Sequence, residues 1–80
     1  MELVEHAKAL IEDKEFSTDV RGEDFTQKAL RRVFAVGKAF VDVSFKQVEL
    51  SQCYFRNCRF IRCDFTGANI SKCYFAWFAI

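Results

Sequence analysis

The sequence contains no proline, so regular backbone pairing is uninterrupted along all 80 residues. It contains only three glycines, and they form no glycine-rich loop of the kind that binds phosphate groups. Its one histidine, His6, has no evident nucleophile or orienting partner. We therefore expect a protein that is not an enzyme and that binds no cofactor.

A strong net charge and long apolar runs are also missing. The formal net charge is +1, so no global field attracts nucleic acid or an anionic membrane. No apolar run approaches the roughly 18 residues of a membrane span. Glu2 and Glu5 stand where a signal peptide would carry a basic stretch. We therefore expect a cytoplasmic protein that contacts no membrane, with its cysteines as free thiols.

Residues 1–15 have the apolar spacing of a short amphipathic helix. Glu2 and Glu5 lie in its first turn, where the helix dipole favours negative charge. One helical face collects Leu3, Val4, Ala7, Leu10 and Ile11. The pattern predicts an α-helix over residues 1–15.

A five-residue period governs the rest of the chain. Every fifth residue from Val20 to Ile80 is apolar. A second column begins at Val43, two positions before Phe45, and its residues are usually small or medium apolar as well. Two inward residues separated by one outward residue make a short strand. The next inward residue comes three positions later, so the chain must turn a corner first. The pattern predicts a solenoid of stacked coils with the apolar columns inside.

Residues 63–72 resemble the repeats of the pentapeptide-repeat family. Their two segments, CDFTG and ANISK, follow a consensus of a small residue, Asp or Asn, Leu or Phe, Ser or Thr, and often Gly. The resemblance extends over residues 43–75. It implies a mainly β fold, the family's right-handed quadrilateral β-helix with four repeats per coil. We expect the helix of residues 1–15 to cap the first coil.

We expect one domain over residues 1–80, with regular repeats over residues 43–80. Residues 20–42 admit two interpretations. The central column continues there, but Glu23, Lys28 and Lys38 occupy the preceding column, where burial of a charge is costly. The same stretch also has apolar residues at helical spacing. It forms either a degenerate first coil or a second helix.

The cysteines do not have the spacing of a metal site. Structural zinc sites use close pairs such as C-x2-C, whereas Cys53, Cys58 and Cys63 are five residues apart and Cys73 follows ten later. On a four-sided coil these side chains point inward from different sides. We therefore assign them to the apolar wall and predict no metal site.

Four repeats per coil place residues twenty apart directly above one another, about 4.8 Å away. The predicted inner pairs are Phe40 and Phe60, Phe45 and Phe65, Phe55 and Phe75, Leu50 and Ile70, and Cys53 and Cys73. The predicted outer pairs are Tyr54 with Tyr74 and the ion pair of Arg62 with Asp42.

Three sets of residues are candidates for an interaction surface. They are the outward residues Tyr54, Tyr74, Arg56, Arg59 and Arg62; the exposed outer pair Val41 and Ile61; and the apolar C-terminal residues Trp77, Phe78 and Ile80. Basic residues beside aromatic rings can bind single-stranded nucleic acid, but the phenylalanines are assigned inward. We therefore expect a protein partner, or self-association through the C-terminal end, and not nucleic acid.

The predicted function is a non-catalytic protein-interaction or structural module. The resemblance also implies an alternative, because members of this family act as DNA mimics that occupy DNA gyrase, a type II topoisomerase. Such a mimic needs a strongly acidic surface, and the coil region here is slightly basic. A further alternative is the N-terminal part of a larger defence or signalling protein.

Overall fold

The computed structural model describes residues 9–76. These residues form eleven strands of two or three residues each. The strands are β1 (Leu10–Glu12), β2 (Glu15–Phe16), β3 (Val20–Arg21), β4 (Ala29–Arg31), β5 (Phe34–Val36), β6 (Ala39–Val41), β7 (Glu49–Ser51), β8 (Tyr54–Arg56), β9 (Arg59–Ile61), β10 (Asn69–Ser71) and β11 (Tyr74–Ala76). In this part of the chain no helix is long and apolar enough to span a membrane.

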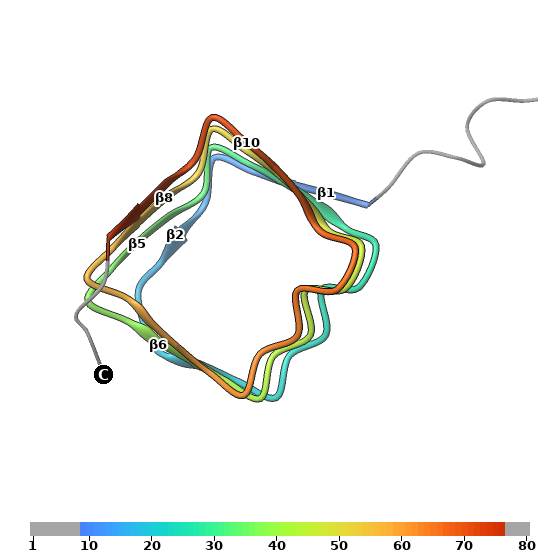
Figure 1. The fold of residues 1–80 in the computed structure, drawn as a ribbon. Coiled ribbons are helices and arrows are strands. Elements are labelled where there is room, and N and C mark those ends of the chain that lie inside the picture. Colours follow the sequence, from blue (N-terminus) through green and yellow to red (C-terminus); the bar gives the residue numbers. More distant parts are fainter. Residues whose placement is uncertain (1–8, 77–80) are drawn as a thin grey trace, which may run out of the picture.

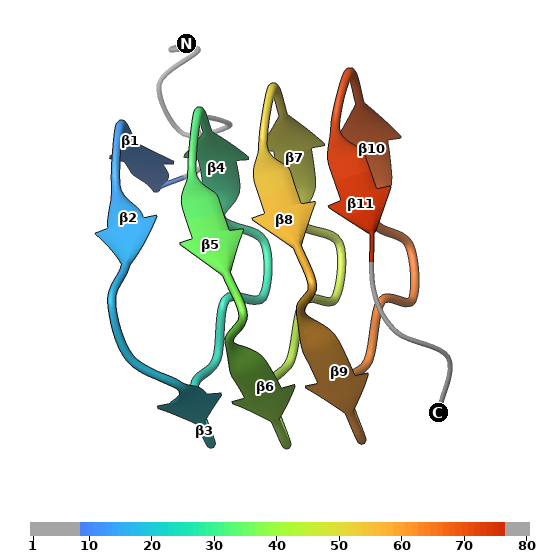
Figure 2. The same ribbon diagram turned by 90° about the vertical axis from the view of Figure 1, so that its left-hand side faces the viewer.

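The strands form three parallel sheets on three sides of a coil (Figures 1 and 2). Sheet A has the order β1-β4-β7-β10, sheet B the order β2-β5-β8-β11, and sheet C the order β3-β6-β9. Each turn of the chain adds one strand to each sheet, and the described residues complete about three turns. The prediction of a mainly β solenoid is confirmed.

The fourth side is built from turns, and we call it the turn side. Isolated bridges join Asp24 to Ser44 and Ser44 to Asp64. The carboxylates of Asp24 and Asp64 accept hydrogen bonds from the backbone N–H groups two residues later, each at 2.9 Å. Such local bonds favour turns over extended strands. The ribbon accordingly steps inward on this side (Figure 1).

Stacked side chains fill the inside of the coil. The rings of Phe45 and Phe65 stack at 4.7 Å with an interplanar angle of 4°. The pairs Phe40–Phe60 and Phe55–Phe75 stack at 5.0 and 5.1 Å, and Leu50 pairs with Ile70. The predicted twenty-residue register is therefore confirmed.

The helix predicted for residues 1–15 is wrong where it overlaps the described residues, and residues 1–8 lie outside them. Residues 10–16 contain β1 and β2 and belong to the first coil. This coil is one residue shorter than the next: Phe16 pairs with Ala35, nineteen residues on, whereas Val20 pairs with Phe40, twenty residues on. The first coil is shorter between Phe16 and Val20, which are four positions apart, whereas their partners Ala35 and Phe40 are five positions apart. A strict five-residue count backward from Val20 therefore reaches Glu15 instead of Phe16 and breaks.

Residues 20–42, for which the sequence leaves coil and helix open, contain β3, β4, β5 and β6. The charged residues of their inner column remain accessible to solvent. Glu23 is exposed, and Lys28 and Lys38 are half-buried. No charged side chain is buried between residues 9 and 76, so residues 20–42 carry charges beside the core without the cost of burying them.

The corners of the coil use left-handed backbone conformations. Positive φ angles recur every five residues from Gly22 to Lys72. Three of the corner residues are glycines, but nine others in the described chain also have positive φ. Between Asp13 and Gly22 no residue has a positive φ, so the shortened first coil passes one corner without this conformation.

Candidate interaction surface

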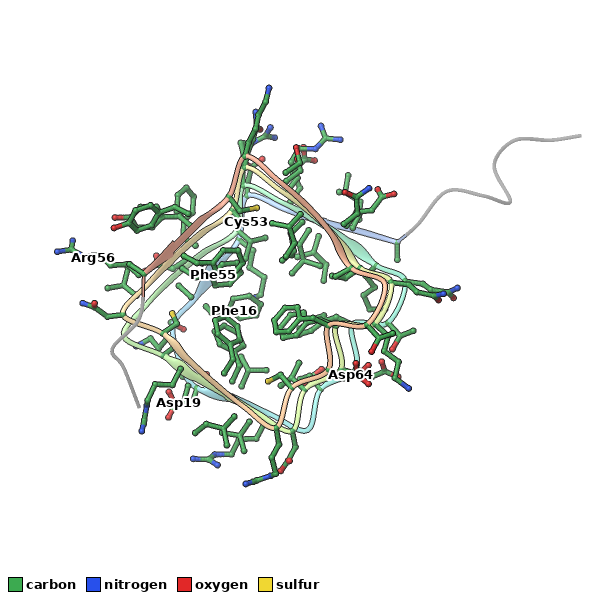
Figure 3. The ribbon with its side chains drawn as sticks, in the orientation of Figure 1. Phe16, Asp19, Cys53, Phe55, Arg56 and Asp64 are labelled. Carbon is green, nitrogen blue, oxygen red and sulfur yellow. The ribbon has the colours of Figure 1, made fainter. Side chains whose placement is uncertain are left out.

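The outer face of sheet B is the main apolar surface in the described part of the chain. Side chains alternate along a strand, so Ala35, Phe55 and Phe75 point inward and their neighbours point outward. Those outward neighbours are Phe34 and Val36 on β5, Tyr54 and Arg56 on β8, and Tyr74 and Ala76 on β11. Figure 3 shows Phe55 directed into the coil and Arg56 directed away from it.

Three of the outward side chains are nearly half exposed. The exposed fractions are 46% for Phe34, 49% for Val36 and 48% for Tyr74. Only Leu10 and Ile70 are comparably exposed among the large hydrophobic residues of the described chain. Apolar exposure is therefore concentrated on sheet B.

The aromatic rings on this face form a ladder along the solenoid. Tyr54 and Tyr74 stack at 4.7 Å with an interplanar angle of 13°, which confirms the predicted outward pair. Phe34 lies 6.3 Å from Tyr54 at a tilt of 54°. The two tyrosines cover the ring faces that they turn toward each other, so a partner that approaches sheet B from outside meets ring edges and hydroxyl groups.

Basic residues flank the ladder in the later coils, whereas the exposed Glu15 of β2 lies opposite Phe34 in the first coil. Residues 31–38, 51–59 and 71–76, which form sheet B and its borders in the later coils, contain no Asp or Glu. Their basic residues are Arg31, Arg32, Lys38, Arg56, Arg59 and Lys72. The near-neutral net charge of the chain therefore conceals a basic, aromatic surface over the later coils of sheet B.

Only part of this basic set is paired within the protein. Arg31 and Arg32 contact Glu12 of the first coil, and Arg32 also contacts Asp13 at 2.6 Å. None of the ion pairs between described residues involves Arg56, Arg59 or Lys72. These side chains are exposed and are available to a partner.

Arg62 does not belong to this surface. It lies at the corner between sheet C and the turn side, where its guanidinium donates a 2.6 Å hydrogen bond to Asp42, as predicted. This hydrogen bond holds the pKa of the Asp42 carboxyl below its ordinary value. Arg62 is therefore occupied by a contact between coils.

The expectation that Val41 and Ile61 form an exposed pair is wrong for Val41. Val41 is 6% exposed, because it lies between Arg21 and Ile61 on the neighbouring strands of sheet C. Ile61 itself is half-buried. Trp77, Phe78 and Ile80 lie outside the described residues.

The cysteines line the inner wall. The thiol groups of Cys53, Cys58 and Cys63 donate hydrogen bonds of 3.1–3.3 Å to backbone carbonyls of the preceding coil. Burial raises the pKa of all three thiols, so they are poor nucleophiles at neutral pH. No group of three potential metal ligands occurs within residues 9–76.

The last described coil exposes part of the inner wall. Ile70 is 47% exposed, whereas Leu50, its partner one coil earlier, is 1% exposed. Phe60, Phe65 and Phe75 are only partly buried. Among the described strands, β9, β10 and β11 each lie at the end of their sheet.

Sequence reasoning found Tyr54, Tyr74 and Arg56 but missed Phe34 and Val36. These two residues lie in the stretch for which a helix was also considered. The signal was present in the outer column, because Phe34, Tyr54 and Tyr74 are each twenty residues apart. Extending the outer column as well as the inner one would have brought them together.

A family model for pentapeptide repeats matches residues 40–75 with eight copies. A search among curated proteins gave no significant match. The matched segment contains the regular inner columns that stack in the structure, from Phe40 to Phe75. Residues 40–75 of the chain are therefore pentapeptide repeats.

Proposed function

We propose that the protein is a non-catalytic protein-interaction module whose binding surface is the outer face of sheet B. The observation that carries this proposal is the ladder of Phe34, Tyr54 and Tyr74, in which Phe34 and Tyr74 are nearly half exposed, with the exposed Val36 beside it. Exposed apolar surface is unfavourable in water unless a partner covers it, and contiguous apolar patches commonly mark binding sites.

The solenoid presents this ladder on a rigid support. The strands below it pair residue by residue, with Phe34 opposite Tyr54 and Tyr54 opposite Tyr74. The inward residues of the same strands are held by stacked rings, as in the 5.1 Å pair of Phe55 and Phe75. Such preorganisation lowers the entropy lost when a partner binds.

Selection from a random peptide display library tests the proposal. Peptides selected on the wild-type protein are re-tested on the double variant Phe34→Ser/Tyr74→Ser. The matched control is Lys46→Ser/Glu49→Ser, which changes exposed residues outside sheet B. We expect most selected peptides to lose binding to the first variant and to keep binding to the control. Equal binding to both folded variants would contradict the proposal.

A second candidate function is assembly through the C-terminal coil, with a second copy of the chain. It is favoured by the exposure of Ile70 and by the position of β10 and β11 at the ends of their sheets among the described strands. Free strand edges pair readily with other strands. Light scattering during size-exclusion chromatography measures the mass directly. We expect a dimer that an Ile70→Asp substitution dissociates, and a monomer at all concentrations would contradict this candidate.

We rank the DNA-mimic alternative below both candidates. A mimic must reproduce the closely spaced negative charges of phosphates, and the borders of sheet B carry basic residues without acidic ones in the later coils. A gyrase supercoiling assay tests this ranking. Strong inhibition by the wild-type protein would overturn it.

A further inference from the structure

We propose that the outer face of sheet B binds a short acidic peptide segment, with apolar side chains at its centre and carboxylates at both ends. This inference rests on the proposed function and specifies the partner's chemistry. It follows from the charge around the ladder, the arrangement of the rings and the size of the apolar patch.

Basic side chains lie on both flanks of the ladder in the later coils, while the acidic Glu15 lies beside Phe34 at the first-coil end. Lys72 is at the corner between sheet A and sheet B, two residues before β11 begins. Arg56 is at the opposite end of β8, and Arg59 follows on β9, beyond the corner to sheet C. The apolar residues lie between these flanks, so a partner whose carboxylates bracket an apolar centre matches the charge pattern of the face.

The ring arrangement favours a peptide over single-stranded nucleic acid. Proteins that bind single strands stack bases on exposed aromatic ring faces. Here Tyr54 and Tyr74 stack on each other at 4.7 Å and leave no space for a base between them. Apolar peptide side chains need no ring face, because they pack against ring edges and against Val36.

The area of the patch favours a short segment over a large folded partner. Phe and Tyr side chains have roughly 150–250 Å² of surface, so the half-exposed ladder and Val36 offer about 300–400 Å² of apolar area. A stable interface between folded proteins buries about 800 Å² on each side. A peptide in extended form crosses the face with about five residues at roughly 3.3 Å each, which matches the five-residue repeat on each side of the coil.

Fluorescence polarisation with a labelled Glu-Glu-Leu-Phe-Leu-Glu-Glu peptide tests the inference on the full chain. A Gln-Gln-Leu-Phe-Leu-Gln-Gln peptide isolates the contribution of charge, and a labelled oligo(dT) of about 12 nucleotides represents single-stranded DNA. We expect the acidic peptide to bind about tenfold more tightly than the Gln peptide. Raising the salt from about 50 mM to about 500 mM should weaken binding of the acidic peptide and leave binding of the Gln peptide unchanged.

Charge-reversal variants locate the site. We expect Arg56→Glu/Lys72→Glu to weaken binding of the acidic peptide by about tenfold or more. The matched control Arg21→Glu/Lys46→Glu, with the same charge change outside sheet B, should change it by less than about twofold. Thermal unfolding of both variants verifies that they are folded.

Each other outcome overturns the inference in an identifiable way. If the Gln peptide binds as tightly as the acidic one, the apolar face is a binding site but the acidic partner is wrong, and the proposed function survives. If oligo(dT) binds more tightly than the acidic peptide, the partner of this face is nucleic acid and not a peptide. Absence of binding by either peptide at about 1 mM would overturn the inference, and the display selection would then decide the proposed function separately.

Discussion

The inner wall differs between the middle of the solenoid and the last described coil. Phe45 is fully buried because Phe25 lies on one side of its ring and Phe65 on the other. Phe65 has the same position in its repeat but is only partly buried. In a solenoid, burial is supplied by the neighbouring coils, so the same residue type stabilises the fold to an extent that depends on its place in the stack.

Replacing these two rings by alanine should give the largest difference. Phe45→Ala removes stacking on both sides and should lower the free energy of unfolding by about 3–5 kcal/mol. Phe65→Ala removes contacts mainly on one side and should cost about 2 kcal/mol. Urea unfolding followed by circular dichroism measures both. Equal losses would mean that the last coil is covered as fully as the middle one.

The same pair of variants also examines the assembly candidate. If a second copy covers the last coil, the free energy of unfolding depends on protein concentration. In that case the loss caused by Phe65→Ala should increase as the protein is concentrated, because the ring then lies in an interface. The loss caused by Phe45→Ala should stay constant.

A smaller difference is expected for the inner cysteines. Cys58 is fully buried and its thiol donates a 3.3 Å hydrogen bond to the carbonyl of Ala35. In Cys58→Ser the hydroxyl keeps a donor but places a more polar atom in the wall, which should cost about 2 kcal/mol. Cys73 is half-buried, so Cys73→Ser should cost less than about 0.5 kcal/mol. Thermal unfolding measures the loss of stability in both variants. An equal loss would contradict the idea that the effect depends on the position of the residue in the stack of coils.

The regular coils were predictable because a five-residue period has few physical solutions. Phe40, Phe45 and Phe60 fall on one five-residue column in the sequence. In the structure Phe40 stacks on Phe60, and Phe45 contacts Phe60 edge to face. The first coil was missed because one residue is absent between Phe16 and Val20. A single deletion moves a charged residue onto the counted column while the strands still pair. A periodicity count finds only repeats of equal length, whereas strand pairing between coils tolerates a side that is one residue shorter.

The surface was harder to predict than the core. Val41 stands at an outward position but is buried by Arg21 and Ile61 on adjacent strands. Such burial depends on residues twenty positions away and on the size of their side chains. The basic surroundings of the ladder likewise come from residues in different coils, which the overall net charge of +1 does not reveal.

For the corner glycines, we expect the substitution in the last described coil to cost more stability than the one in the middle of the solenoid. Gly37 and Gly67 both have positive φ, of 68° and 71°, so alanine at either corner should cost about 1 kcal/mol. A Cβ at Gly37 meets nothing within 4 Å, whereas at Gly67 it would lie 3.1 Å from Cγ of Gln47. Gly67→Ala should therefore be the more destabilising of the two. Thermal unfolding of both variants measures the order, and a milder effect at Gly67 would show that Gln47 moves aside freely.

The smallest effect concerns two carboxylates with different kinds of support. Arg62 of the third coil lowers the pKa of Asp42 through a hydrogen bond between coils. Thr66 lowers the pKa of Asp64 within a single turn. In Arg62→Ala, the pKa of Asp42 should therefore rise toward its ordinary value of 3.8, while that of Asp64 stays low. Carbon NMR titration of the side-chain carboxyls reports both groups in the same sample.

The sign of the pH dependence follows from the lowered pKa of Asp42. A carboxyl with a depressed pKa in the folded state stabilises the fold above its ordinary pKa, and this contribution disappears as the pH falls through the folded value. Because the pair is exposed, solvent screens it and the change in stability is small. The free energies of unfolding of wild type and Arg62→Ala should therefore differ slightly above about pH 4, and the difference should disappear in stronger acid. A difference that persists unchanged into strong acid would mean that Arg62 stabilises the coil by packing and not by its charge.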